Sequence, residues 1–268
     1  MSFFNDVLNI LKQYYPFLLR GVGYTLLISL IGTVAGFLIG LLTGMLRTAP
    51  MPKNPVRRFF RKLLCGIIAV YVEIFRGTPM MVQAMVIYWG YAFASGGNTL
   101  PLIPSGIIIV SINTGAYMAE IVRGGIISID KGQFEGASAV GMTHSQTMLH
   151  VILPQVIRNI LPSVSNEFVI NIKDTCVLSV IGTVELFFTT NGVAGAEYTY
   201  FEAFTITMAI YFVLTFVCSR LLRLLENRMD GSASYDLATT DTLAHTSGLY
   251  SYHEPRPQAG RSDTREGR

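Results

Sequence analysis

GVGYTLLISLIGTVAGFLIGLLTGML, residues 21–46, is the stretch that decides the fold class of this chain. It carries no charged side chain and is longer than the roughly 20 apolar residues that a helix needs to cross a bilayer. Within it, glycine recurs at every fourth position, at Gly32, Gly36, Gly40 and Gly44. Residues spaced by four share one face of a helix, and a face of small residues lets another helix come close in a membrane. The stretch therefore predicts a membrane-spanning helix that packs tightly against a second helix.

The composition of the whole chain extends this prediction to the rest of the fold. The 268 residues are 51% hydrophobic and only 14% charged, whereas soluble domains carry about 25% charged residues. Further apolar runs of spanning length lie at about 63–93, 105–122, 154–181 and 203–222. We expect an all-α, multi-pass integral membrane protein with about five transmembrane helices.

The charges of the loops orient these helices. Cytoplasmic loops are enriched in Lys and Arg, and the loop after the first span holds Arg47, Lys53, Arg57, Arg58, Arg61 and Lys62 without a single acid. The segment 185–202 has acids but no Lys or Arg, as an external loop would. We therefore expect the N-terminus outside and the C-terminus in the cytoplasm. A nucleic-acid surface is a poor interpretation of the basic cluster, because the cluster lies between two apolar spans.

The chain divides into three regions on these grounds. Residues 1–20 mix apolar residues with tyrosines and a lysine, which predicts an interfacial segment. Residues 21–229 form the transmembrane domain, and residues 230–268 have the polar composition of a disordered cytoplasmic tail. The 3 cysteines lie far apart in apolar sequence, without the paired spacing of a zinc site, so we expect no metal and no cofactor.

The second apolar run is too long for one straight helix and contains Phe-Arg-Gly-Thr-Pro at residues 75–79. Proline has no backbone N–H and clashes with the preceding turn, so Pro79 should kink or break the helix. We expect two limbs that meet at this point.

The longest polar connection between spans, about 130–153, is the main candidate for an interaction segment. It contains Glu-Gly-Ala-Ser-Ala-Val-Gly at residues 135–141, and Gly141 can adopt a positive φ. We expect a short helix that turns at Gly141, with Pro154 separating the next stretch from the fourth span. Such a helix of small residues would fit a groove in another protein, and an ordinary interhelical loop is the alternative. His144 and His150 do not share a helix face, so we expect interface or surface residues rather than metal ligands.

This connection resembles the EAA loop of ABC importer permeases, in which an acid and two alanines precede a glycine and, nine residues later, Ile-x-Leu-Pro. The chain departs from that pattern with Gly136 for the first alanine and Val151 for the isoleucine, and both changes keep small size or apolar character. The resemblance implies that the loop docks on an ATPase through Glu135, Gly136, Ala137, Gly141, Leu153 and Pro154.

The resemblance continues over roughly residues 15–228. Tyr-Val-Glu-Ile-Phe-Arg-Gly-Thr-Pro at residues 71–79, followed by Val82, Gln83 and Tyr88, is similar to the second-span signature of polar amino acid permeases of the histidine, arginine and glutamine type. The same family pattern continues at 113–117, Glu120, 123–126, 128–129, 132–133 and 173–175. The resemblance implies the type I ABC importer permease fold and a location in the bacterial cytoplasmic membrane.

The same resemblance implies a set of partners. Two permease chains, identical or paralogous, would line one path for a polar amino acid within the membrane lipid. Two ABC ATPase subunits would bind beneath them, and an extracytoplasmic solute-binding protein would deliver the substrate. The chain has no G-x-x-x-x-G-K-[ST] segment, so we expect a transport subunit that is not itself an enzyme.

Polar residues inside the expected spans are the candidates for substrate contact, because such residues are costly in a membrane. A zwitterionic amino acid needs an acceptor for its ammonium group, for which Glu120 and Asp174 are candidates. It also needs a donor for its carboxylate. Asn113, Thr175 and Lys173 are candidates for that role, and Tyr117 lies on the helix face shared by Asn113 and Glu120.

Ion pairing within the protein is the alternative for these charges. Lys173 and Asp174 could pair with each other, or with Glu120 or Arg76 across helices. Glu73 and Arg76, three residues apart, are expected to pair.

Two other classes of protein predict different features from an importer subunit. A self-sufficient secondary transporter, with the buried charges as a proton relay, predicts a repeat or broken helices in both halves. The sequence shows one broken helix and no convincing repeat. A membrane-embedded enzyme would need a cluster such as His and Asp within the spans, and none of the expected spans contains histidine.

Overall fold

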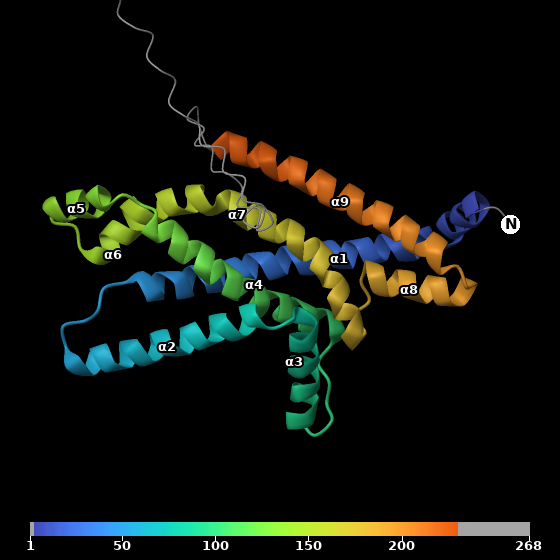
Figure 1. The fold of residues 1–268 in the computed structure, drawn as a ribbon, viewed down its shortest axis with the longest axis horizontal. Coiled ribbons are helices and arrows are strands. Elements are labelled where there is room, and N and C mark those ends of the chain that lie inside the picture. Colours follow the sequence, from blue (N-terminus) through green and yellow to red (C-terminus); the bar gives the residue numbers. More distant parts are fainter. Residues whose placement is uncertain (1–2, 230–268) are drawn as a thin grey trace, which may run out of the picture. The chain divides into compact units, whose positions relative to one another are not determined.

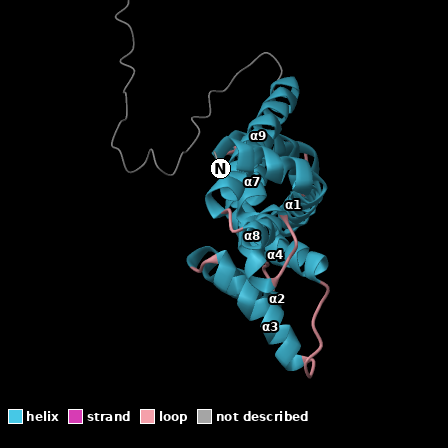
Figure 2. Ribbon diagram, turned by 90° about the vertical axis from the view of Figure 1, so that its right-hand side faces the viewer, coloured by secondary structure: helices cyan, strands magenta, loops and turns pink. Residues whose placement is uncertain are grey.

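The computed structural model describes residues 3–229, and the predicted tail, 230–268, lies outside them. In this range the chain is a set of helices joined by loops (Figures 1 and 2). The elements are α1 (Phe3–Thr48), α2 (Pro55–Gly77), α3 (Met80–Ala94), α4 (Leu102–Ile127), α5 (Lys131–Ala139), α6 (His144–Thr147), the π-helix η1 (Met148–Ile152), α7 (Leu153–Asp174), the 3₁₀-helix η2 (Thr175–Ile181), α8 (Leu186–Glu197) and α9 (Tyr200–Met229).

The helices account for the expected membrane spans. Three of them, α1, α4 and α9, are long and apolar enough to cross a bilayer, and the number rises to 5 if each of two bent pairs forms one span. The pair α2 and α3 bends by 116°, and the pair formed by residues 144–181 and α8 bends by 56°. The prediction of an all-α membrane protein with about five spans is confirmed. Because α1 is one helix of 46 residues, no helix boundary separates the expected interfacial segment, 1–20, from the first span.

The glycine stripe of α1 packs directly on α4. Carbon atoms added at the four glycines would collide, in order along the chain, with Val110, Thr114, Met118 and Val122. At Gly36 the added carbon would lie 2.7 Å from Thr114 Cβ, well inside van der Waals contact. Since both series advance by four residues in the same direction, α1 and α4 run parallel. The predicted close helix contact is confirmed, and its partner is the third expected span.

The break before Pro79 is as predicted. Thr78 adopts an extended backbone conformation between α2 and α3, and α3 points away from the direction of α2 (Figure 1). The Gln83 amide donates hydrogen bonds to the carbonyl oxygens of Phe75 and Thr78, at 3.0 and 2.9 Å. The carbonyls that lose helical partners at the break are therefore satisfied by a side chain of the next helix.

Helix α8 corrects the expectation of a loop between residues 185 and 202. Glu185 is fully buried and caps α8, accepting hydrogen bonds from the backbone N–H groups of Phe187 and Phe188 at 2.8 and 2.7 Å. The Tyr211 hydroxyl of α9 also donates to this carboxylate, at 3.0 Å. An acid that loop composition assigns to solvent instead begins a helix, because a carboxylate satisfies the free N–H groups at a helix N-terminus.

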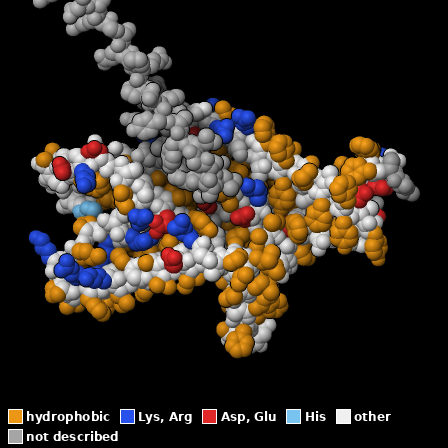
Figure 3. Space-filling model, in the orientation of Figure 1, with side chains coloured by type: hydrophobic (Ala, Val, Ile, Leu, Met, Phe, Trp, Pro, Cys, Tyr) orange, Lys and Arg blue, Asp and Glu red, His pale blue; other side chains and the backbone are white. Residues whose placement is uncertain are grey.

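The two ends of the described structure differ in the segments that they carry. The α1–α2 loop, α5 and α6 lie at one end, whereas α8 and the start of α1 lie at the other (Figure 1). In the space-filling view, Lys and Arg side chains gather at the first of these ends, around the start of α2 (Figure 3). This grouping agrees with the expectation that the basic loop and the α5 segment lie on the same side of the membrane. The orientation of the chain in the membrane stays a prediction.

Candidate functional site

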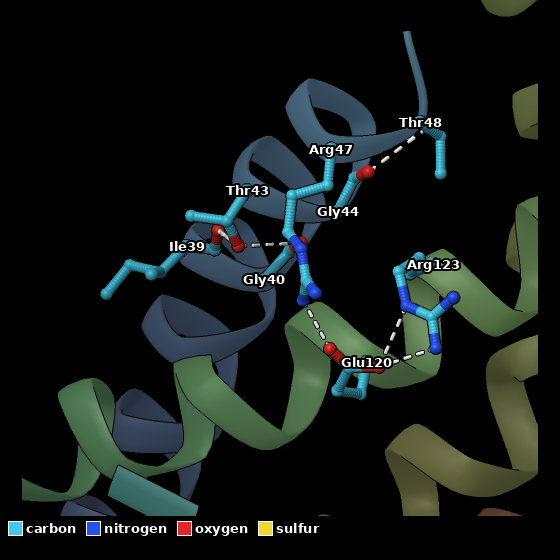
Figure 4. Close-up of polar contacts among 8 residues, drawn as sticks. All are labelled: Ile39, Gly40, Thr43, Gly44, Arg47, Thr48, Glu120 and Arg123. Atoms are coloured by element: carbon cyan, nitrogen blue, oxygen red, sulfur yellow. Dashed lines mark hydrogen bonds and ion pairs between the residues drawn. The ribbon is translucent and has the colours of Figure 1, made fainter. Parts of the chain in front are cut away.

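Glu120, a candidate for contact with substrate, lies in a cluster of ions between α1 and α4 (Figure 4). One carboxylate oxygen pairs with Arg47 in the last turn of α1. The other accepts from Arg123, one helical turn further along α4, with nitrogen–oxygen distances of 2.8 Å. Both oxygens of Glu120 are therefore engaged by cations, and neither Lys173 nor Arg76 is the partner.

Asn113 lies on the same face of α4 and is buried. Its amide nitrogen donates to Gln83 Oε1 at 2.8 Å and reaches the Phe75 carbonyl at 3.4 Å. The side chain therefore belongs to the hydrogen-bonded network that holds the break between α2 and α3.

Tyr117, one turn after Asn113, is half-buried and receives the Arg76 guanidinium over its ring at 5.6 Å from the centroid. A cation over an aromatic face is attracted by the ring quadrupole. Within residues 3–229, no ion pair joins Arg76 to Glu73, so the pairing expected from their spacing is wrong. Arg76 instead links the end of α2 to α4.

The three candidates at the end of α7 point in different directions. Lys173 and Asp174 are both exposed, and neither forms an ion pair within the described part of the chain. Adjacent helical residues point about 100° apart, and the Lys173 side chain lines a cleft between α7 and α9. Thr175 is fully buried and donates to the Ile172 carbonyl at 2.9 Å. The structure therefore does not gather these residues with Glu120 into one site.

Glu167 is a charged residue of the fourth span that the sequence analysis missed. It lies on α7 two turns before Asp174, on the same face. Asp174 and Arg76 are charged groups that lie near it. The signal was available in the sequence, as an acid inside an apolar run. Arg76 of α2, over Tyr117 of α4, and the carboxylates of Glu167 and Asp174 on α7 therefore lie on neighbouring surfaces of these three helices.

Asn171 is a second residue that was missed, and it occupies the core. It is 3% exposed, and its amide nitrogen donates to Thr33 Oγ1 at 2.8 Å and to Thr114 Oγ1 at 3.0 Å. Thr114 Oγ1 in turn lies 3.2 Å from Asn171 Oδ1. A single side chain therefore ties α1, α4 and α7 together by buried hydrogen bonds.

The segment expected to dock on an ATPase, residues about 130–153, is called the coupling segment below. It begins with the short helix α5, which is anchored on one side and exposed on the other. Asp130 caps α5, and Ala137 is 6% exposed. Phe134 packs against an apolar cluster that includes Ile152 and Val156. The opposite face presents Glu135, Gly136, Ser138 and Ala139 to solvent.

The predicted turn at Gly141 is confirmed, because its φ is +81°. Hydrogen bonds from Gly141 N to Ser138 O and from Met142 N to Ala137 O, both 3.0 Å, end α5. A positive φ is strained for residues with a side chain, so glycine is required here. At the turn, Val140 is 76% exposed and stands out as an apolar tip.

Pro154 does not separate the following stretch from the fourth span, which corrects that prediction. The chain runs from α6 through the π-helix η1 into α7 without a break, and Pro154 lies in the first turn of α7. The Leu153 N–H bonds to the Met148 carbonyl, five residues earlier. We attribute the continuity to this wider turn, which accommodates a residue that has no N–H to donate. Leu153 is buried, whereas Pro154 is exposed.

Comparisons with known proteins agree on one family. Residues 36–231 match the family described as binding-protein-dependent transport system inner membrane component. The chain is 36% identical over 214 residues to the glutamine transport system permease protein GlnP of Escherichia coli (strain K12), covering 80% of this chain and 93% of that protein. It is 34% identical over 220 residues to the L-cystine transport system permease protein TcyB of Bacillus subtilis (strain 168), covering 82% and 89%. A crystal structure of an amino acid ABC transporter with histidines is 37% identical, with a TM-score of 0.72, and the match covers 83% of this chain and 98% of that one.

Proposed function

Because this chain belongs to the family of binding-protein-dependent transport system inner membrane components, we propose that it is the permease subunit of an ATP-driven importer of polar amino acids. Its relatives are named for the transport of glutamine and cystine. The chain takes a type I ABC importer permease fold in the inner membrane. In this proposal, a separate ATPase supplies the energy and a solute-binding protein supplies the substrate from outside.

The observation that carries the proposal is the geometry of the coupling segment. Helix α5 is fixed to the core by Phe134 and Ala137, and a Gly141 turn presents the apolar tip Val140 beyond it. An anchored helix with an exposed apolar tip transmits force as a rigid element. In this role, Glu135, Gly136 and Ala137 form the docking helix, Gly141 sets its turn, and Leu153 and Pro154 begin the helix that carries the movement into the membrane.

For the substrate, we propose that the amino acid contacts the surface shared by α2, α4 and α7. Asp174 and Glu167 would accept its ammonium group, and Arg76, held over Tyr117, would meet its carboxylate. Glu120, Asn113 and Thr175 are engaged in contacts within the chain, so they would act on the substrate only by giving up those contacts. A second permease chain, identical or paralogous, would complete the path.

The experiment is co-purification of the tagged full chain from its native membranes, with identification of the partners by mass spectrometry. Val140→Asp places a charge on the exposed tip without touching the core. Val56→Asp, at a site 62% exposed on α2, is the matched control. We expect a P-loop ATPase to co-purify with the unmodified chain and with Val56→Asp, and to be depleted with Val140→Asp.

Two results would contradict the proposal. If no ATPase accompanies the unmodified chain and a protonophore abolishes uptake of labelled amino acid, the chain is a secondary transporter. If Val140→Asp retains the ATPase as fully as the control, the docking assignment of the α5 segment is wrong even if the importer assignment holds.

A further inference from the structure

A cleft of about 260 Å³ lies between α7 and α9, and nothing in the importer function accounts for its charges. Lys173, Arg220 and Arg223 line it, and no acid does. Within residues 3–229, none of these three cations forms an ion pair. Arg220 lies over the Phe216 ring, 5.1 Å from its centroid. Unpaired cations on membrane helices are costly, so an anion in this cleft would be strongly favoured.

The other polar groups of the cleft narrow the chemistry of its ligand. Thr215 Oγ1 already donates to the Tyr211 carbonyl at 2.9 Å, and Ser219 Oγ donates to the Thr215 carbonyl at 2.6 Å. The hydrogen-bond donors that remain are those of the three cations. The ligand must therefore present several acceptor oxygens and negative charge, as a phosphate group does.

The apolar wall of the cleft indicates that the ligand is an amphiphile. Phe212 and Phe216 line the cleft as a stacked pair with centroids 6.0 Å apart, and they are 67% and 50% exposed. The exposed apolar surface continues along α9 through Val213, Val217 and Leu221. A free anion would leave this surface uncovered, whereas acyl chains attached to the anion would cover it.

We infer that the cleft between α7 and α9 binds the headgroup of an anionic phospholipid, with its phosphate between Lys173, Arg220 and Arg223 and its acyl chains along α9. A basic pocket between transmembrane helices is a favourable environment for such headgroups. Lys173 then serves the lipid and not the carboxylate of a transported amino acid. The inference requires only a bilayer, so it is independent of the importer assignment.

The test is native mass spectrometry of the delipidated full chain in non-ionic detergent, titrated with dioleoyl phosphatidylglycerol or dioleoyl phosphatidylcholine. Each cation near a headgroup contributes about fivefold in affinity. The double variant Arg220→Gln/Arg223→Gln should therefore bind phosphatidylglycerol about 25-fold more weakly. The control, Arg57→Gln/Arg58→Gln, removes the same charge from exposed positions on α2 and should leave the saturable site unchanged. Far-UV circular dichroism would verify that both variants keep their helices.

Three results would overturn the inference. Equal affinity for the two lipids would show that binding does not depend on the charge of the headgroup. Displacement of the lipid by inorganic phosphate or glycerol phosphate at equal concentration would identify a site for a free anion. A dimeric chain that takes up no saturable phosphatidylglycerol would show that a second copy covers the cleft.

Discussion

Replacing Gly40 by alanine is the sharpest test of how α1 and α4 are held together. A carbon added at Gly40 would lie 2.6 Å from the backbone carbonyl carbon of Met118 and 2.8 Å from the backbone nitrogen of Ala119. Met118 Cβ, which is fixed to the backbone, lies closer still, and ordinary van der Waals contact begins near 3.4 Å, so the helices must separate by at least about 0.8 Å. No side-chain rotation relieves the clash, because the backbone of α4 is the obstacle.

The energetic effect follows from that separation. A gap of 0.5–1 Å forfeits about a quarter to a half of each dispersion contact, and dispersion is a principal force between helices in lipid. Overpacking of this kind destabilises proteins by about 1–3 kcal/mol. We expect Gly40→Ala to fall in that range, although alanine favours a helix over glycine by about 1 kcal/mol.

The assay is unfolding of the purified chain by sodium dodecyl sulfate in mixed micelles, followed by far-UV circular dichroism. Gly23→Ala is the matched control, because it lies on the same helix and an added carbon there meets nothing within 4 Å. It should be neutral or stabilising. Met118→Ala should not rescue Gly40→Ala, since the backbone clash remains. If Gly40→Ala and Gly23→Ala have the same free energy of unfolding, or if Met118→Ala restores the stability of Gly40→Ala, a backbone clash between α1 and α4 is refuted.

Two further changes test the polar contacts of the bundle. Asn171→Leu removes the buried hydrogen bonds to Thr33 and Thr114 and should lower the free energy of unfolding by about 1–2 kcal/mol, measured in the same assay; an unchanged value would show that the network adds nothing. Glu120→Gln keeps the shape of the side chain but leaves the two arginines of Figure 4 facing each other without a counter-ion. Because the carboxylate is about 20% exposed, we expect a loss of about 1 kcal/mol at low salt. Added salt should reduce the loss of stability, because it screens the repulsion between the two arginines. Thermal unfolding of both proteins at two ionic strengths would measure this, and a loss that does not change with salt would contradict the prediction.

The parts of the site that the sequence predicts correctly depend on local chemistry. The break before Pro79 follows from a missing N–H, and the turn at Gly141 follows from a φ that other residues disfavour. The short helix α5 was expected from the small residues in the segment 135–141. Predictions from the same local reasoning were wrong where distant groups compete: Arg76 turns to Tyr117 on another helix instead of Glu73 on its own.

The sequence by itself determined that the chain is a membrane bundle, how many spans it is expected to have, and which face of α1 would be packed. These properties depend on the composition, on the length of the apolar runs and on the spacing of the glycines. All three can be determined without knowing which helices contact each other. Only the tertiary structure decided that α4 is the partner of α1 and that Glu120 meets Arg47. It also decided that Glu185 is buried and that Lys173 joins two arginines of α9. A stripe of glycines predicts close packing against some helix, and a buried charge predicts some counter-ion. Which helix or residue fills that role depends on how distant parts of the chain pack together.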